Sequence, residues 1–122
     1  MDIADLQPAI KVIIRSSASP KGAAFGPGIA ALCRGIRETG SLNAAAKHMH
    51  MAYSKAWRII KEAEDSLNCQ ILIRNGAHGS TLTPDAEYLL TCYDRIYNKI
   101  HTTAISQFEE IKQQEKPSDD LS

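Results

Sequence analysis

Residues 40–57 read GSLNAAAKHMHMAYSKAW, and this stretch decides the fold. Gly40 is a typical helix terminator, because glycine adopts the left-handed conformation at low cost. Ser41 is a residue type that caps the start of a following helix. We therefore predict a short helix over 44–49, whose three consecutive alanines allow another helix to approach closely. A third helix is predicted over about 52–68, and the joint of about three residues before it is typical of a helix-turn-helix.

The flanking sequence completes a winged helix-turn-helix domain. A β-branched run predicts a short strand over 9–16, and the glycines, prolines and serines of 16–28 predict a loop. Two further strands are predicted over 70–74 and 81–83, joined by a turn at 75–80, and this hairpin would be the wing. Before Gly40, apolar residues recur at the i, i+3, i+4, i+7 spacing of an amphipathic helix at Ile29, Leu32, Cys33 and Ile36.

A long helix is predicted to follow the hairpin. Thr83 offers a capping hydroxyl and Pro84 suits the first helical position. The apolar stripe continues for about 32 residues, or about 48 Å, which is more than a domain over residues 1–83 could cover. We therefore expect residues 84–115 to form a homodimer, with 116–122 as a disordered tail. The expected interface comprises Leu89, Tyr93, Ile96, Tyr97, Ile100, Ala104, Phe108 and Ile111. The expected fold class is mainly α with a small β-hairpin: a winged helix-turn-helix plus a long C-terminal dimerisation helix.

The charge of the chain is unevenly distributed, although the formal net charge is zero. Residues 11–74 hold ten basic and four acidic side chains, whereas residues 75–122 hold four basic and eight acidic ones. A basic block beside an acidic segment indicates a localised electrostatic footprint, as in nucleic-acid-binding proteins.

Several functional classes lack support in the sequence. Three scattered cysteines without a C-x-x-C spacing favour small apolar core residues over a disulfide framework or a zinc site. His48 and His50 have no third ligand nearby, so we expect no metal site and no cofactor. The chain has no nucleophile elbow, P-loop, dinucleotide fingerprint or paired carboxylates, so we expect no catalytic activity. It also has no signal-peptide pattern and no apolar run of membrane-spanning length, which predicts a cytoplasmic protein without membrane contact.

Three segments resemble the N-terminal DNA-binding domain of the molybdate-dependent regulators, the ModE family: FGPG at 25–28, ETGSLNAAA at 38–46 and MAYSKAW at 51–57. The hairpin end at 82–84 is also similar to that family and, more loosely, to LysR-type regulators. The resemblance covers about residues 8–110 and implies a dimeric winged helix-turn-helix that binds double-stranded DNA. The chain differs from the usual family pattern in three respects. The chain contains no molybdate-binding modules, alanine stands at position 52 where the family usually has a capping serine, and the wing turn is shorter.

The resemblance and the fold together nominate DNA contacts. In a helix-turn-helix the N-terminal part of the third helix enters the major groove, where an arginine can recognise guanine with two hydrogen bonds. Arg58 is the candidate for that role. The other expected contacts, to bases, to phosphates or from the wing, are Asn43, Lys47, Tyr53, Ser54, Lys55, Lys61, Arg74 and His78. Tyr53 could face either DNA or the core, and core packing is the favoured role for Trp57.

Two alternatives to a DNA-binding regulator stay open. The acidic C-terminal part and the uncapped third helix would also suit a winged-helix module that dimerises or binds proteins without specific DNA binding. A small ligand in the dimer interface would make the protein a one-component sensor, although no pocket signature supports this. The operator, the effector and the sign of regulation do not follow from the sequence.

Overall fold

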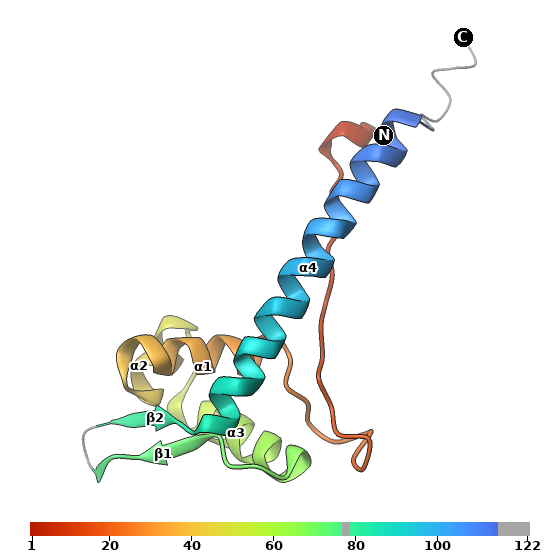
Figure 1. Ribbon diagram of the computed structural model, residues 1–122. Coiled ribbons are helices and arrows are strands. Elements are labelled where there is room, and N and C mark those ends of the chain that lie inside the picture. Colours follow the sequence, from red (N-terminus) through yellow and green to blue (C-terminus); the bar gives the residue numbers. More distant parts are fainter. Residues whose placement is uncertain (77–78, 115–122) are drawn as a thin grey trace.

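A computed structural model describes residues 1–76 and 79–114 and shows a winged helix-turn-helix from which one long helix projects (Figure 1). Helix α1 spans Pro27–Thr39, α2 spans Leu42–His48 and α3 spans Tyr53–Leu67. The mostly helical architecture with a small antiparallel hairpin agrees with the fold class expected from the sequence.

The helix ends follow the local signals predicted from the sequence. Gly40 adopts a left-handed conformation (φ 75°) and ends α1, while the Ser41 side chain accepts a hydrogen bond of 3.1 Å from the Ala44 amide at the start of α2. His50 takes a positive φ of 53° in the joint between α2 and α3. Ala52 provides no side-chain cap for α3, because its methyl group cannot accept a hydrogen bond. The predicted starts of α2 and α3 differ from the observed ones by two residues or fewer.

The core lies where α1, α2 and α3 meet the first turns of the long helix. All four apolar positions predicted for the first helix are buried, and α3 buries Ala56, Ile60 and Ala63. The alanines of α2 permit the close approach expected of them, because a Cβ added to Gly35 of α1 would lie only 2.7 Å from the Cβ of Ala45. Of the three cysteines, Cys33 is fully buried but the other two are only partly buried, so the expectation of core cysteines is confirmed for Cys33 alone.

The hairpin is shorter than predicted. Strand β1 spans Leu72–Arg74 and β2 spans Ser80–Leu82, paired antiparallel with Leu72 opposite Leu82. The Ser80 amide donates a 2.8 Å hydrogen bond to the carbonyl of Gly40, which fastens the wing to the turn between α1 and α2.

Helix α4 spans Pro84–Gln114, 31 residues, and extends away from the winged domain (Figure 1). The Thr83 hydroxyl accepts a hydrogen bond of 3.1 Å from the Ala86 amide, so the predicted cap is present. At about 1.5 Å per residue the helix is about 46 Å long. The predicted tail at 116–122 lies outside the described residues. No helix in the described ranges is long and apolar enough to cross a membrane.

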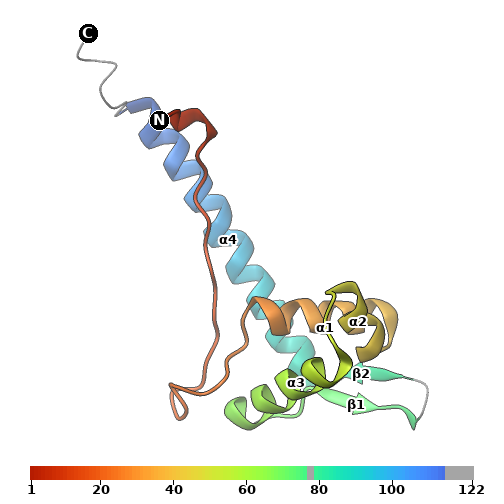
Figure 2. The same cartoon turned by 180° about the vertical axis from the view of Figure 1, so that it is seen from behind.

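The strand predicted over 9–16 is wrong. Among the described residues this segment forms only one isolated bridge, between Ile14 and Phe25, and it otherwise runs extended alongside α4 (Figures 1 and 2). Its residues alternate between exposed and partly buried, which explains why the pattern resembles a strand. A short 3-10 turn at Ile3–Asp5 precedes it, and the Lys112 ammonium donates a 2.7 Å hydrogen bond to the carbonyl of Leu6, which holds this N-terminal arm (residues 1–16) at the far end of α4.

Candidate nucleic-acid interface

The first half of α3 exposes two cations that have no ion-pair partner among the described residues. Ser54, Lys55 and Arg58 are all exposed in the first half of the helix. In the described part of the chain, no carboxylate lies within 4.0 Å of the Lys55 ammonium or the Arg58 guanidinium. These two cations are therefore available to an anionic partner.

Lys61 is placed differently from the other predicted contacts. Its ammonium forms an ion pair of 3.1 Å with Glu64 and lies 4.6 Å from the ring centroid of Trp57. Its side chain is still about half exposed. A phosphate could therefore compete with Glu64 for Lys61, but the contact would strengthen binding less than a contact with an unpaired lysine.

The basic block counted in the sequence is partly neutralised by α4. Arg34 pairs with Asp94 at 2.6 Å, and Arg37 pairs with Glu87 at 2.7 Å, so two acids of α4 compensate two arginines of α1. The hydrogen bonds that the Arg37 guanidinium donates to Glu87 raise the pKa of Arg37 above its ordinary value. Two acids of the acidic C-terminal part are thus turned to the α1 side of the domain, whereas Lys55, Arg58 and Arg74 form no ion pair among the described residues.

Tyr53 and Trp57 lie on the flank of α3 that faces the wing. The Arg74 guanidinium donates a 2.7 Å hydrogen bond to the Tyr53 hydroxyl, and its central carbon lies 4.7 Å from the Trp57 ring centroid. Trp57 is partly buried and packs against the core, as expected, whereas Tyr53 is 41% exposed. The structure therefore brings together three residues from two elements that the sequence did not link.

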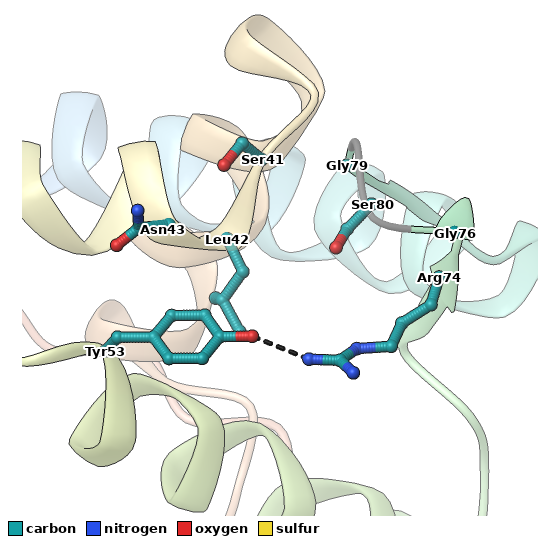
Figure 3. A pocket seen from close by; sticks show the side chains of 8 residues that line it. All are labelled: Ser41, Leu42, Asn43, Tyr53, Arg74, Gly76, Gly79 and Ser80. Atoms are coloured by element: carbon teal, nitrogen blue, oxygen red, sulfur yellow. Dashed lines mark hydrogen bonds between the residues drawn. The ribbon is translucent and has the colours of Figure 1, made fainter.

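A cleft of about 480 Å³ separates the start of α2 from the wing (Figure 3). Figure 3 shows the Arg74 side chain reaching from β1 toward Tyr53 along one side of this cleft. The cleft is lined chiefly by polar side chains, and its walls include Ser41, Leu42, Asn43, Tyr53, Arg74 and Ser80.

The remaining predicted contacts have mixed outcomes. Asn43 and Lys47 are exposed on α2, so they are accessible as predicted contacts. His78 lies outside the described residues. No group of three or more potential metal-ligating side chains, His48 and His50 included, occurs among the residues that the structure describes.

Glu64 is an organising residue that the sequence analysis missed. The Glu64 side chain is only 11% exposed. One of its carboxylate oxygens accepts hydrogen bonds from the amides of Ile71 (2.7 Å) and Leu72 (3.4 Å). It therefore fastens the end of α3 to the first wing strand. The available signal was an acidic residue three positions after Lys61, but that pattern is equally typical of a solvent-exposed ion pair.

The predicted dimer face of α4 is partly covered by the chain itself. Tyr93 is only 5% exposed and packs edge-on against Phe25, so it belongs to the core of its own protomer and is not an interface residue. The reason is that Tyr93 lies where α4 is still packed on the winged domain. Further along, Ile96, Ile100 and Ile111 are 44%, 49% and 40% exposed. Partly buried positions of the predicted face are Leu89, Tyr97, Ala104 and Phe108.

Comparisons with known proteins find a similar family for the helix-turn-helix segment. Residues 31–87 match the family model described as bacterial regulatory helix-turn-helix protein, lysR family. The match runs from α1 through the hairpin into the first turn of α4. No curated protein sequence matches the chain.

A solved structure has a similar fold. The crystal structure of VV2_1132, a LysR family transcriptional regulator, aligns with a TM-score of 0.53 and 21% sequence identity. The alignment covers 74% of this chain but only 29% of that one, so the chain spans less than a third of the length of that regulator. The solved structure supports the winged helix-turn-helix fold, and the family match shows that residues 31–87 are similar to the lysR-family helix-turn-helix. Neither confirms the narrower resemblance to the molybdate-dependent regulators.

Proposed function

We propose that this protein is a sequence-specific DNA-binding transcription regulator that acts as a homodimer. In this proposal α3 enters the major groove and the wing lies at the minor groove. The observation that carries the proposal is the exposed pair Lys55 and Arg58, which has no carboxylate partner among the described residues and lies on the α3 half that a helix-turn-helix inserts into DNA. The lysR-family match over residues 31–87 supports the same function.

The two cations would contribute differently. Arg58 can donate two hydrogen bonds to one guanine and so select sequence, whereas Lys55 would contact phosphate and strengthen binding to any sequence. The exposed α2 residues Asn43 and Lys47 would contact the backbone from the other side of the turn. Ser54 is exposed beside both cations and would contact either a phosphate or a base.

The homodimer is supported by the exposed apolar residues of α4. Ile96 and Ile100 are one helical turn apart and both are more than 40% exposed. A second copy of α4 would remove them from water and would place two α3 helices about 34 Å apart, the spacing of successive major grooves. Replacing Ile100 by Asp should convert the dimer to a monomer in sedimentation experiments, and Ser106→Asp, at an exposed position on another face of the helix, should not. Equal masses for the wild type and Ile100→Asp would contradict this interface.

DNA binding is tested with the purified protein and genomic fragments that include its own promoter region, at two salt concentrations. We expect selective retention of a few fragments and an affinity that falls steeply with salt, because bound phosphates displace counterions. Arg58→Ala should relax sequence selectivity, and Lys55→Ala should weaken binding to all fragments alike. Lys21→Ala, an exposed lysine in the loop before α1, is the matched control. Unselective or salt-independent retention would instead favour a module that binds proteins.

A further inference from the structure

The side chain of Arg74, which comes from the wing, is held by two aromatic residues of α3. One nitrogen of its guanidinium donates to the Tyr53 hydroxyl at 2.7 Å, and the group lies over the Trp57 ring at 4.7 Å. Tyr53 and Trp57 are one helical turn apart on α3, so they form a cradle for a side chain that comes from β1. A hydrogen bond and a cation–π contact restrict a side chain that would otherwise lose much rotamer freedom on binding.

The charge of Arg74 is not compensated. No carboxylate of the described residues lies within 4.0 Å of its guanidinium, and its hydrogen bond to Tyr53 involves a neutral oxygen. A guanidinium has five N–H donors, of which this bond uses one. The remaining donors lie at a cleft of about 480 Å³ whose other wall carries the hydroxyl of Ser41 and the amide of Asn43. This arrangement suits an anion with several acceptor oxygens.

We propose that Arg74 is a DNA phosphate clamp between the recognition helix and the wing, and that Tyr53 and Trp57 are positioning residues for Arg74 instead of direct DNA contacts. The proposal rests on the proposed DNA binding and deepens it. It assigns a role to Tyr53, whose side chain the sequence pattern left open between DNA and the core. It also moves Arg74 from the minor groove, where the wing of such a fold is expected, to the backbone between the grooves.

A double-mutant cycle separates positioning from direct contact. Tyr53→Phe keeps the ring and removes the hydroxyl, and it should weaken binding about 2- to 10-fold, as expected for one hydrogen bond. Arg74→Ala should weaken binding to all sequences alike and lower the slope of log affinity against log salt by about one. In the Arg74→Ala background, Tyr53→Phe should have no further effect, because the group that it positions is gone. If Tyr53→Phe costs the same in both backgrounds, Tyr53 contacts DNA directly and the proposal is wrong.

Two controls distinguish this proposal from the broader function. Tyr88→Phe makes the same change at a tyrosine that is 71% exposed on α4, and it should leave binding unchanged. Because Trp57 is the single tryptophan of the chain, its fluorescence reports on the cradle without DNA. Arg74→Ala should increase quenching of Trp57 by acrylamide, and Arg74→Lys should restore only part of the protection. An intact cradle in a protein that binds no DNA would refute the clamp and the proposed function together. Selective DNA binding that Arg74→Ala leaves unchanged would refute the clamp alone.

Discussion

Gly35 in the middle of α1 offers a test of how tightly the helix-turn-helix is packed. A Cβ built on Gly35 would lie 2.7 Å from the Cβ of Ala45 and 3.2 Å from its Cα. Two non-bonded carbons prefer about 3.5–4.0 Å, so Gly35→Ala forces α1 and α2 apart by about an ångström. Ala45 is only 1% exposed, and neither side chain has a rotamer that relieves the contact.

The magnitude follows from two opposing effects. Overpacking of a core costs about 1–3 kcal/mol, whereas alanine in place of a helical glycine gains up to about 1 kcal/mol. The net expectation for Gly35→Ala is a loss of about 1 kcal/mol in the free energy of unfolding. Gly28→Ala in the first turn of the same helix is the matched control, because nothing lies within 4 Å of a Cβ there. The difference between the two variants mainly reflects the clash and should be about 1–3 kcal/mol.

Urea unfolding followed by circular dichroism measures this difference, and a lower midpoint at an unchanged slope would assign it to the native packing. Removing the opposing methyl group with Ala45→Gly in the Gly35→Ala background should relieve the clash, so the two changes should cost less together than the sum of the single variants. Equal stability of Gly35→Ala and Gly28→Ala, or additive effects of Gly35→Ala and Ala45→Gly, would contradict the expected clash. Either result would mean that α1 and α2 can separate at little cost.

Three further predictions concern the wing, the start of α4 and the core. Glu64→Ala should lower the free energy of unfolding by about 1–3 kcal/mol, because it leaves the buried amide of Ile71 without its 2.7 Å acceptor, and Glu64→Gln should recover part of this in urea titrations. Thr83→Val should cost about 1 kcal/mol through loss of the helix cap, seen as a lower melting temperature. An unchanged melting temperature would mean that this cap does not stabilise α4. Burial raises the pKa of the Cys33 thiol to about 12, so the folded state keeps a proton that the unfolded state loses near its ordinary value of about 8.5. Stability should therefore fall as the pH rises from about 9 toward 12, and this fall should be smaller in Cys33→Ala.

Local signals predicted most of the winged domain, because each depends on residues that are neighbours in the chain. Gly40 ends α1 through its own conformational freedom, and Ser41 caps α2 through an amide three residues away. Thr83 does the same at α4. The first strand was predicted to begin at Gln70, because the apolar run that follows it is typical of a strand. In the structure the Ile71 amide instead donates to the Glu64 carboxylate, and the strand begins at Leu72.

The N-terminal arm could not be predicted, because its structure depends on contacts between the two ends of the described chain. The Lys112 ammonium reaches the carbonyl of Leu6 across 106 residues of sequence. Residues 9–16 have the alternation of a half-buried strand, and that pattern is the same whether the buried side faces a sheet or a helix. The sequence therefore indicated the extended conformation correctly but not what lies beside it.

The helical periodicity of α3 identified the residues that face the core. It could not distinguish, among the remaining residues, those that stay free from those that contact the wing. Lys55 and Arg58 point away from the domain, whereas Tyr53, Trp57 and Lys61 share a flank at intervals of four residues. What meets that flank is Arg74, which arrives only after the chain has left α3 and entered the wing. The candidate site is therefore divided into a free half, which a sequence pattern can nominate, and an anchored half, which exists only in the folded domain. Under the proposed function, substitutions at Lys55 and Arg58 should therefore change DNA binding directly, whereas substitutions at Tyr53 and Trp57 should act through Arg74.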